Sequence, residues 1–346
     1  MNRQPAETLL AALPKAELHL HLEGSIEPAS VVELAARHGV ALTREEAAAR
    51  YAYADFPGFL EAFKWVTSFL RAPADYAFVT ERLAEQLLRQ NVVYAEVTVS
   101  VGVMLRRQQD PEANFAAILQ AAAPAQAKSL RLQWIFDAVR QFGPAAAMEV
   151  ARRAAQMKGE HVVAFGMGGD ELALPAVDFR RVYEYVAGEG LHRLVHAGEI
   201  GAPQSVRQAV EFLNAERIGH GIAAMRDERT MDFLAARQIP LEICPTSNFS
   251  TGALARQLGR PGPKPADHPL REFYARGLAV ALSTDDPAMF HTDLLGEYRL
   301  ALAMGLKPRD LVRIAEMGLE FAFLPAHEKQ ALLDAFRAKK SLPGLL

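Results

Sequence analysis

The most regular feature of the sequence is a short apolar segment that recurs eight times along the chain. These segments are rich in valine, isoleucine and leucine, and amphipathic stretches long enough for a helix, such as 205–214 and 227–237, lie between most of them. Parallel strands that are buried on both faces have this composition, with polar residues confined to their ends. The predicted strands cover residues 16–22, 92–100, 132–139, 161–167, 192–197, 217–222, 240–245 and 278–284.

Strand alternating with helix eight times predicts a closed (β/α)8 TIM barrel with extra helices. The connection over residues 23–91 is too long for one helix, so we expect several helices over or beside the barrel mouth. Residues 291–340 are predicted to be helical again, with breaks at Pro308 and Pro325. Because no repeat or linker interrupts this pattern, we expect one barrel domain over residues 1–346.

The first predicted strand carries two histidines on one face. Residues 16–24 read Ala-Glu-Leu-His-Leu-His-Leu-Glu-Gly, and side chains alternate along a strand, so His19 and His21 point one way and the leucines the other. Two imidazoles side by side form half of a metal site, although each ring could instead hydrogen-bond to the backbone. The rest of a coordination shell must come from elsewhere in the chain.

Further candidate groups follow the fifth, sixth and eighth predicted strands. The segment HRLVHAGE contains His196 and Glu199, RIGHG contains His220, and LAVALSTDDP contains Asp285 and Asp286. Active sites of (β/α)8 barrels lie at the carboxyl ends of the strands. We therefore expect these side chains to meet the two histidines of the first strand.

Histidines together with one carboxylate are ordinary ligands of zinc. A zinc ion lowers the pKa of a bound water to about 7 and so supplies hydroxide at neutral pH. Glu199 is placed to protonate a substrate with a poor leaving group such as ammonia, while His220 and Asp286 remain to orient and deprotonate the water. The alternative for Asp285 and Asp286, which precede a proline, is a simple helix N-cap.

Composition narrows the class of protein. The 346 residues are 50% hydrophobic with a net charge of −3, and without a basic stripe we expect no nucleic-acid partner. No window approaches a membrane span, and MNRQPAETLLAALPKAE lacks the apolar core of a secretory signal. Cys244 is the only cysteine, which excludes a disulfide framework and a thiolate metal cluster. A cytoplasmic location is therefore expected.

Four motifs, HLHLEG, HAGE, GHG and STDDP, resemble in order and spacing the adenosine deaminase family, a (β/α)8 branch of the metal-dependent amidohydrolases. The resemblance runs over almost the whole chain and includes VVAFGMGGDE at the fourth strand and LEICPTSNFSTGA at the seventh. It implies a hydrolytic deaminase of a 6-aminopurine that binds one zinc ion per chain. Two-metal amidohydrolases place a carboxylated lysine after the fourth strand, whereas Lys158 precedes that strand here.

The resemblance also implies a role for each motif residue. Glu199 would protonate N1 of the purine. His220 would take a proton from the zinc-bound water or hold the hydroxide in line, and Asp286 would orient it and hydrogen-bond N7. The backbone of Gly169 would approach N3. The zinc ligands would be His19, His21, His196 and Asp285.

One departure from the family pattern affects the expected substrate. Adenosine deaminases usually have Asp-Gly where this chain has Glu23-Gly24, and relatives with Glu act on free adenine or on the 5′-extended nucleoside aminodeoxyfutalosine. HAGEIGAP lacks the second Glu of adenine specialists, and Arg140 could bind a substrate carboxylate or form a surface salt bridge. We expect adenosine or its 5′-carboxylated analogue, with adenine as the alternative. The substrate-binding residues are expected to be His21, Glu23, Gly169, Asp286 and Arg140.

Several other features have two interpretations. Phe56, Phe59 and Phe63 fall at helical spacing. They form either an ordinary buried helix face or an apolar wall over a flat aromatic substrate. Asp170 and Glu171 are expected to be solvated or to pair locally. The histidines outside the motifs are expected to be structural: His38, His161, His192, His268, His291 and His327.

Two functions outside this class also remain open. One is a different metal-dependent hydrolase on the same barrel, and the other is a non-catalytic binding protein that has kept the fold. The complete set of motif residues argues against both. The oligomeric state is left open.

Overall fold

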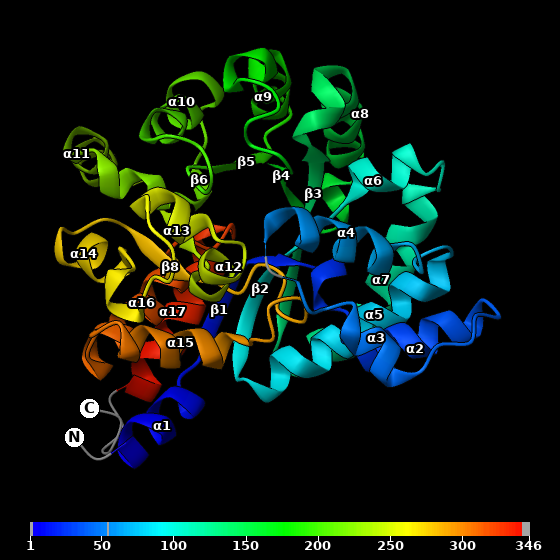
Figure 1. Cartoon of the computed structure of the whole chain (residues 1–346), viewed down its shortest axis with the longest axis horizontal. Coiled ribbons are helices and arrows are strands. Elements are labelled where there is room, and N and C mark those ends of the chain that lie inside the picture. Colours follow the sequence, from blue (N-terminus) through cyan, green and yellow to red (C-terminus); the bar gives the residue numbers. More distant parts are fainter. Residues whose placement is uncertain (1–2, 54, 341–346) are drawn as a thin grey trace.

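Eight parallel strands form the centre of the molecule in the computed structural model, which describes residues 3–53 and 55–340 (Figure 1). Each strand pairs with the next one along the chain. All eight predicted strands are present, within a few residues of the predicted bounds. They are β1 (Lys15–His21), β2 (Val92–Val99), β3 (Arg131–Val139), β4 (Val162–Gly168), β5 (His192–Ala197), β6 (Arg217–His220), β7 (Leu241–Ile243) and β8 (Val280–Leu282).

The barrel is closed by the segment that follows β8. Asp285 forms a parallel bridge with Leu20 of β1. Its backbone N–H donates to the carbonyl of His19 at 2.9 Å, and its own carbonyl accepts the N–H of His21 at 2.9 Å. The closing seam thus joins the two histidines of the first strand to the aspartate of the last.

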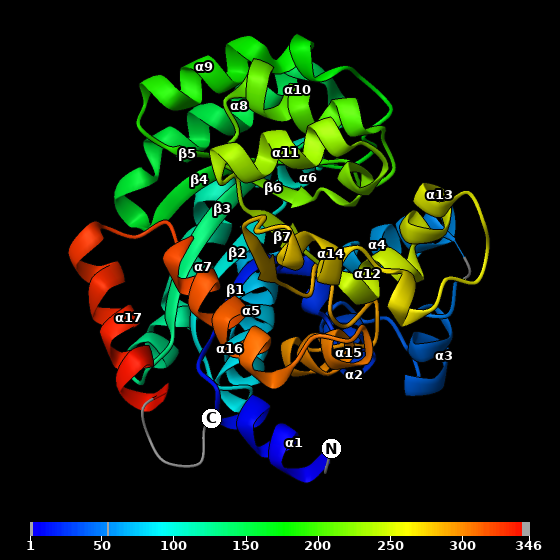
Figure 2. The same cartoon turned by 90° about the vertical axis from the view of Figure 1, so that its left-hand side faces the viewer.

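Helices surround the strands, as Figures 1 and 2 show for α8 to α11 and α14. The predicted helix 205–214 is confirmed as α10, in which the buried residues Val206, Ala209 and Leu213 recur at helical spacing. The outer helices are α6 (Val101–Arg106), α7 (Pro111–Gln126), α8 (Gly143–Gln156), α9 (Arg180–Gly188), α10 (Pro203–Leu213), α11 (Glu228–Arg237), α12 (Pro245–Ser250), α13 (Ala253–Leu258) and α14 (Leu270–Ala275).

The extra helices lie where the sequence predicts them. Pro308 begins one helix of the final segment, and Pro325 directly precedes another, because proline is tolerated at a helix start but not in its interior. That segment forms α15 (Leu294–Ala303), α16 (Pro308–Glu320) and α17 (Ala326–Lys340), and α1 (Arg3–Ala12) precedes the barrel. The long first connection forms α2 (Pro28–Arg37), α3 (Arg44–Ala49), α4 (Phe56–Thr67) and α5 (Pro73–Arg89). No helix of the described residues is long and apolar enough to cross a membrane.

A buried ion-pair network fills the barrel below the strand ends. Arg217 of β6 pairs with Glu96 of β2 and Glu242 of β7, and the ring of Phe323 lies 3.8 Å from the Arg217 guanidinium. Buried charges are tolerated when they are paired and hydrogen-bonded. His192 stacks on the same phenylalanine, so this histidine belongs to the end of the barrel opposite the strand ends.

Candidate active site

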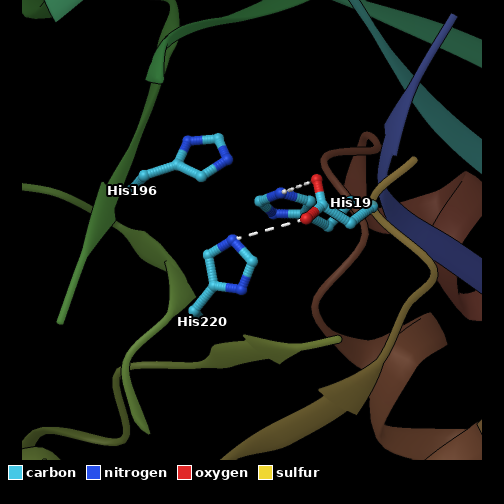
Figure 3. Close-up of side chains that lie close together, drawn as sticks. His19, His196 and His220 are labelled. Carbon is cyan, nitrogen blue, oxygen red and sulfur yellow. Dashed lines mark ion pairs between the residues drawn. The ribbon is translucent and has the colours of Figure 1, made fainter. Parts of the chain in front are cut away.

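Four histidines and one aspartate converge at the carboxyl ends of the strands. We call His19, His21, His196, His220 and Asp285 the His/Asp cluster. Three of its rings turn toward one another in Figure 3. Oδ1 of Asp285 lies 3.5 Å from Nε2 of His19 and 3.4 Å from Nε2 of His21, and Oδ2 lies 3.8 Å from Nε2 of His220.

Two strand ends in the cluster have left-handed backbones. His220 has φ 63° and Asp285 has φ 66°. Residues other than glycine rarely adopt this conformation, and where they do the surrounding structure must hold them there. The turn after each strand therefore aims the side chain inward across the mouth of the barrel.

The cluster has the chemistry of a metal site. Potential ligand atoms of His19, His196, His220 and Asp285 all lie within 4.8 Å of one another. Nε2 of His19 is buried and finds no hydrogen-bond partner among the described residues, while its Nδ1 lies 2.8 Å from Oε2 of Glu242. A ring held in this way by an outer carboxylate presents a bare nitrogen to a metal. The donor set fits one zinc ion.

The charges in the cluster also suit a cation. Burial lowers the pKa of His21 and of His220 to about 4, so both rings are neutral at neutral pH. Around His19, burial is outweighed by Asp285 and Glu242, which raise its pKa well above the ordinary value. Burial raises the pKa of Asp285, but the surrounding imidazoles outweigh it and keep this carboxylate ionised.

Glu199 stands in the turn after β5, beside the cluster. Its Oε2 lies 3.7 Å from Nε2 of His220. Burial raises the pKa of Glu199 to about 8, and the negative charges of Asp285 and Glu171 act in the same direction. A carboxyl group with this pKa is protonated at neutral pH and can donate a proton.

Asp286 and Glu23 each present an unpaired carboxyl oxygen in the same region. Oδ1 of Asp286 and Oε2 of Glu23 are buried without a hydrogen-bond partner among the described residues, while Oε1 of Glu23 accepts the N–H of Ser100 at 2.9 Å. Burial and the nearby Asp285 charge raise the pKa of Asp286 well above its ordinary value. A Cβ on Gly24 would overlap Asp286. Buried orphan oxygens of this kind are expected where a ligand supplies the partner.

One cavity of about 200 Å³ joins the rest of the His/Asp cluster to Glu199 and Asp286, whereas His19 and Glu23 are not part of its wall. Gly169 lies in its wall with φ 90°, and a Cβ there would overlap the Gln141 side chain, so the backbone can come close to a ligand only because the residue is glycine. Side chains of α4 and Phe142 also form part of the wall. From α4 these are Phe56, Phe59, Leu60, Phe63 and Lys64.

The comparisons with known proteins agree with this geometry. The chain matches the adenosine deaminase family over residues 14–339. The chain belongs to the adenosine deaminase family. An aminodeoxyfutalosine deaminase of Streptomyces coelicolor is 39% identical over 332 residues, which cover 94% of this chain and 84% of that protein.

Two solved structures share the fold of this family member. The adenine deaminase of Arthrobacter aurescens is 29% identical with a TM-score of 0.86, covering 94% of this chain and 99% of that one. An amidohydrolase of Burkholderia ambifaria with bound zinc is 25% identical with a TM-score of 0.85, covering 97% and 92%. The predicted barrel, the predicted family and the predicted class of aminohydrolase are confirmed, and the His/Asp cluster fits the predicted zinc ion.

The structure brings almost all of the predicted site residues of this deaminase together, but not Arg140. That side chain is 4% exposed and is not part of the cavity wall. Its guanidinium donates to the carbonyls of Leu174 and His196, at 3.3 and 3.0 Å. Arg140 therefore forms no salt bridge with the residues that the structure describes, and instead supports the end of β5, close to a predicted zinc ligand.

The expectation for Glu171 is wrong. Far from being solvated, its side chain is buried and accepts hydrogen bonds from four successive backbone N–H groups and one hydroxyl. A carboxylate satisfies so many donors only where a turn points them all inward, which the sequence pattern does not reveal. The donors are Gly198, Glu199, Ile200, Gly201 and Ser205.

Several supporting residues were missed. Ser247 donates to Oδ2 of Asp285 at 2.7 Å, and the Asn248 side chain lies 3.1 Å from Nδ1 of His220. Both stand in LEICPTSNFSTGA, a motif that the resemblance includes without a role for these residues. Glu242, the partner of His19, had a visible signal, because it is a charge inside an apolar strand. His268, expected to be structural, contacts Asn248 and so lies beside the site.

Proposed function

We propose that this chain removes the 6-amino group of a purine nucleoside with a carboxylated 5′-extension, of the aminodeoxyfutalosine kind. The products are the 6-oxopurine nucleoside and ammonia. The observation that carries the chemistry is the buried Glu199 carboxyl group beside the His/Asp cluster in one cavity. The S. coelicolor relative supports the choice of substrate. We place the reaction in the cytoplasm, with a small purine nucleoside as the substrate and no nucleic-acid or membrane partner; the oligomeric state stays open.

The residues divide the work of a hydrolytic deamination. His19, His21, His196 and Asp285 would hold the zinc ion, which when bound supplies an activated water at neutral pH. Glu199 donates its proton to N1 and makes C6 open to attack by the water oxygen. The protonated form of Asp286 can donate to N7, a nitrogen that only accepts, and burial together with the Asp285 charge raises the pKa of Asp286 toward this form. As the water oxygen bonds to C6, one of its protons passes to the amino group, which leaves as ammonia when the C6–N bond breaks. The other proton restores the Glu199 carboxyl group.

The sugar side of the cavity favours a nucleoside over the free base. The unpaired Oε2 of Glu23 can accept a hydrogen bond from a ribose hydroxyl. Asp137, near the end of β3, is a buried carboxyl group in the cavity wall. Burial and the Glu23 charge raise its pKa to about 8. Free adenine would leave Oε2 of Glu23 without a partner, which is costly for a buried polar atom.

The side of the cavity formed by α4 suits an extended, negatively charged arm. Phe56, Phe59 and Phe63 line it, in agreement with the interpretation of these residues as an apolar wall. Lys64 also lines it, and its exposed partner Glu61 lies 2.7 Å from the ammonium. With Arg140 held elsewhere, Lys64 is the cation that we assign to the substrate carboxylate.

Ultraviolet progress curves on metal-analysed protein test this proposal directly. Adenosine, adenine and aminodeoxyfutalosine are compared in parallel, with the Glu199→Gln protein as the background control. We expect the highest kcat/KM with aminodeoxyfutalosine. A dominant rate with adenine would overturn the assigned substrate while leaving the deamination chemistry intact.

Free adenine is the second candidate, because the A. aurescens structure that matches this fold belongs to an adenine deaminase. The same three curves decide between the two candidates. No turnover of any of the three by zinc-loaded protein would contradict the proposed function as a whole.

A further inference from the structure

A chain of buried hydrogen bonds leads away from the outer nitrogen of His220. Nδ1 of His220 lies 3.1 Å from Nδ2 of Asn248, and Oδ1 of Asn248 lies 3.2 Å from Nε2 of His268. The backbone N–H of Leu270 donates to Nδ1 of His268 at 3.2 Å. All four residues are buried, so water does not substitute for a missing partner.

The backbone group at the far end sets the direction of every bond in this chain. An N–H can only donate, so Nδ1 of His268 carries no proton and its neutral ring has its proton on Nε2. Burial lowers the pKa of His268 to about 3, which keeps the ring neutral. His268 then donates to Oδ1 of Asn248, and the amide nitrogen of Asn248 donates to Nδ1 of His220. The proton of a neutral His220 is thereby left on Nε2, the nitrogen that faces the cluster.

Two other histidines of the cluster have the opposite arrangement. Nδ1 of His19 faces the carboxylate of Glu242 at 2.8 Å, and Nδ1 of His196 faces the carbonyl of Met167 at 3.2 Å. Both partners can only accept when Glu242 is ionised, so in the neutral form of each ring Nδ1 carries the proton and Nε2 is bare. By distance, His220 belongs with these rings, but its Nδ1 faces a donor where theirs face acceptors.

We propose that Asn248 and His268 are positioning residues that hold the proton of His220 on Nε2, so that His220 donates a hydrogen bond into the site and does not ligate the metal. Of the two roles that the sequence leaves open for His220, holding the attacking oxygen in line is the one that a protonated Nε2 can perform. The catalytic consequence rests on the proposed deamination, whereas the position of the proton does not.

Reversing the chain would break its last bond. If Nε2 of His220 were bare, Nδ1 would donate to Asn248, the amide would turn over, and His268 would point its own N–H at that of Leu270. Two buried donors would then face each other without an acceptor, and each would destabilise the fold by its full desolvation free energy. The fold therefore selects one arrangement.

The test uses full-length protein with ¹⁵N-labelled histidine, studied by NMR without metal and with zinc. We expect His220 to show a protonated Nε2 and a bare Nδ1 in both states, and His196 to show the reverse in the zinc-free protein. A bare Nε2 on His220 in the wild-type protein would overturn the proposal. This readout needs no substrate, so it stands even if the proposed reaction fails.

Two variants of His268 supply a matched pair. His268→Gln keeps a donor toward Asn248 and an acceptor toward Leu270, whereas His268→Phe removes both and fills a similar space. We expect the Phe variant to show both tautomers of His220 and a kcat about 10- to 100-fold lower, with little change in KM. The Gln variant should show the wild-type tautomer of His220 and a kcat close to that of the wild type. Equal spectra and equal rates in the two variants would contradict the proposal.

Discussion

The carboxylate of Glu171 holds the turn that carries Glu199: its Oε2 accepts the backbone N–H of Glu199 at 3.1 Å. The neighbouring N–H groups of Gly198 and Gly201 point at the same carboxylate. From the other side, Gln257 of α13 donates to the carbonyl of Glu199 at 2.8 Å. Glu199, the proposed proton donor, therefore stands on a turn whose backbone N–H groups and whose backbone carbonyl are both held by hydrogen bonds.

Replacing Glu171 by glutamine should disturb both stability and catalysis. The amide has one acceptor oxygen and turns its NH₂ group toward backbone donors, and each buried donor left unpaired costs about 1–3 kcal/mol. A displacement of Glu199 by a fraction of an ångström to one ångström would lower kcat by up to about 100-fold. Thermal denaturation and steady-state kinetics measure the two effects.

The adjacent variant Asp170→Asn is the control for this experiment. Among the described residues, Oδ1 of Asp170 accepts a hydrogen bond from the nearby N–H of Leu172 alone, and the side chain is only partly buried, so we expect near-normal stability and turnover. Similar losses in both variants would show that the turn does not depend on Glu171 in particular.

Activity should fall as the pH rises through the pKa of Glu199. The group acts as an acid, so its useful form is complete below a pKa of about 8 and is lost above it. The profile of kcat/KM against pH reports this group in the free enzyme. A profile that stays flat well above pH 8, with metal content unchanged, would contradict the assignment.

The Glu199→Gln variant isolates the same proton. It should lower kcat by about 100- to 10,000-fold while zinc remains bound, because Glu199 is not among the predicted ligands. Metal analysis of the purified variant provides the check. A near-normal rate would refute the role of Glu199 as the acid.

Metal binding should depend on the histidines at the strand ends and not on those at the opposite end of the barrel. We expect His21→Ala to lose zinc on dialysis against a chelator under conditions in which the wild type retains it. His192→Ala is the matched control, since His192 pairs with Glu216 at 2.9 Å far from the cluster. Elemental analysis that finds equal zinc in the two variants would remove His21 from the ligand set.

Substrate choice should respond to Lys64. Because Lys64 is exposed and its ion pairs are screened, a single contact is worth about 0.2–1 kcal/mol, so Lys64→Met should raise KM for aminodeoxyfutalosine only a few-fold. The KM for adenosine should not change. Lys264→Met, at another exposed lysine, is the control, and a rise in KM for both nucleosides would argue against a carboxylate contact.

The local pattern of the sequence was enough to predict the strands and the residues at their ends. Apolar runs and period-two alternation are properties of neighbouring residues, so β1 and the histidines on its inner face could be recognised without the fold. The same is true of Glu199 and Asp286, which follow apolar strands directly. The carboxyl ends of all strands lie at the same face of a barrel, so the prediction of the strands also predicted that these side chains lie at that face.

Only the tertiary structure decided how these groups are supported. The seam at Asp285, the anchor at Glu171 and the chain through Asn248 to His268 join segments that are distant in the sequence. Each depends on which loop reaches which strand end and on the direction in which its hydrogen-bonding groups point. Arg140 shows that position after a strand does not by itself predict a place in the site. It follows a strand as the site residues do, yet nearby carbonyls hold its guanidinium away from the cavity. The local sequence pattern determines where along a strand a side chain lies, and tertiary packing determines which groups it contacts.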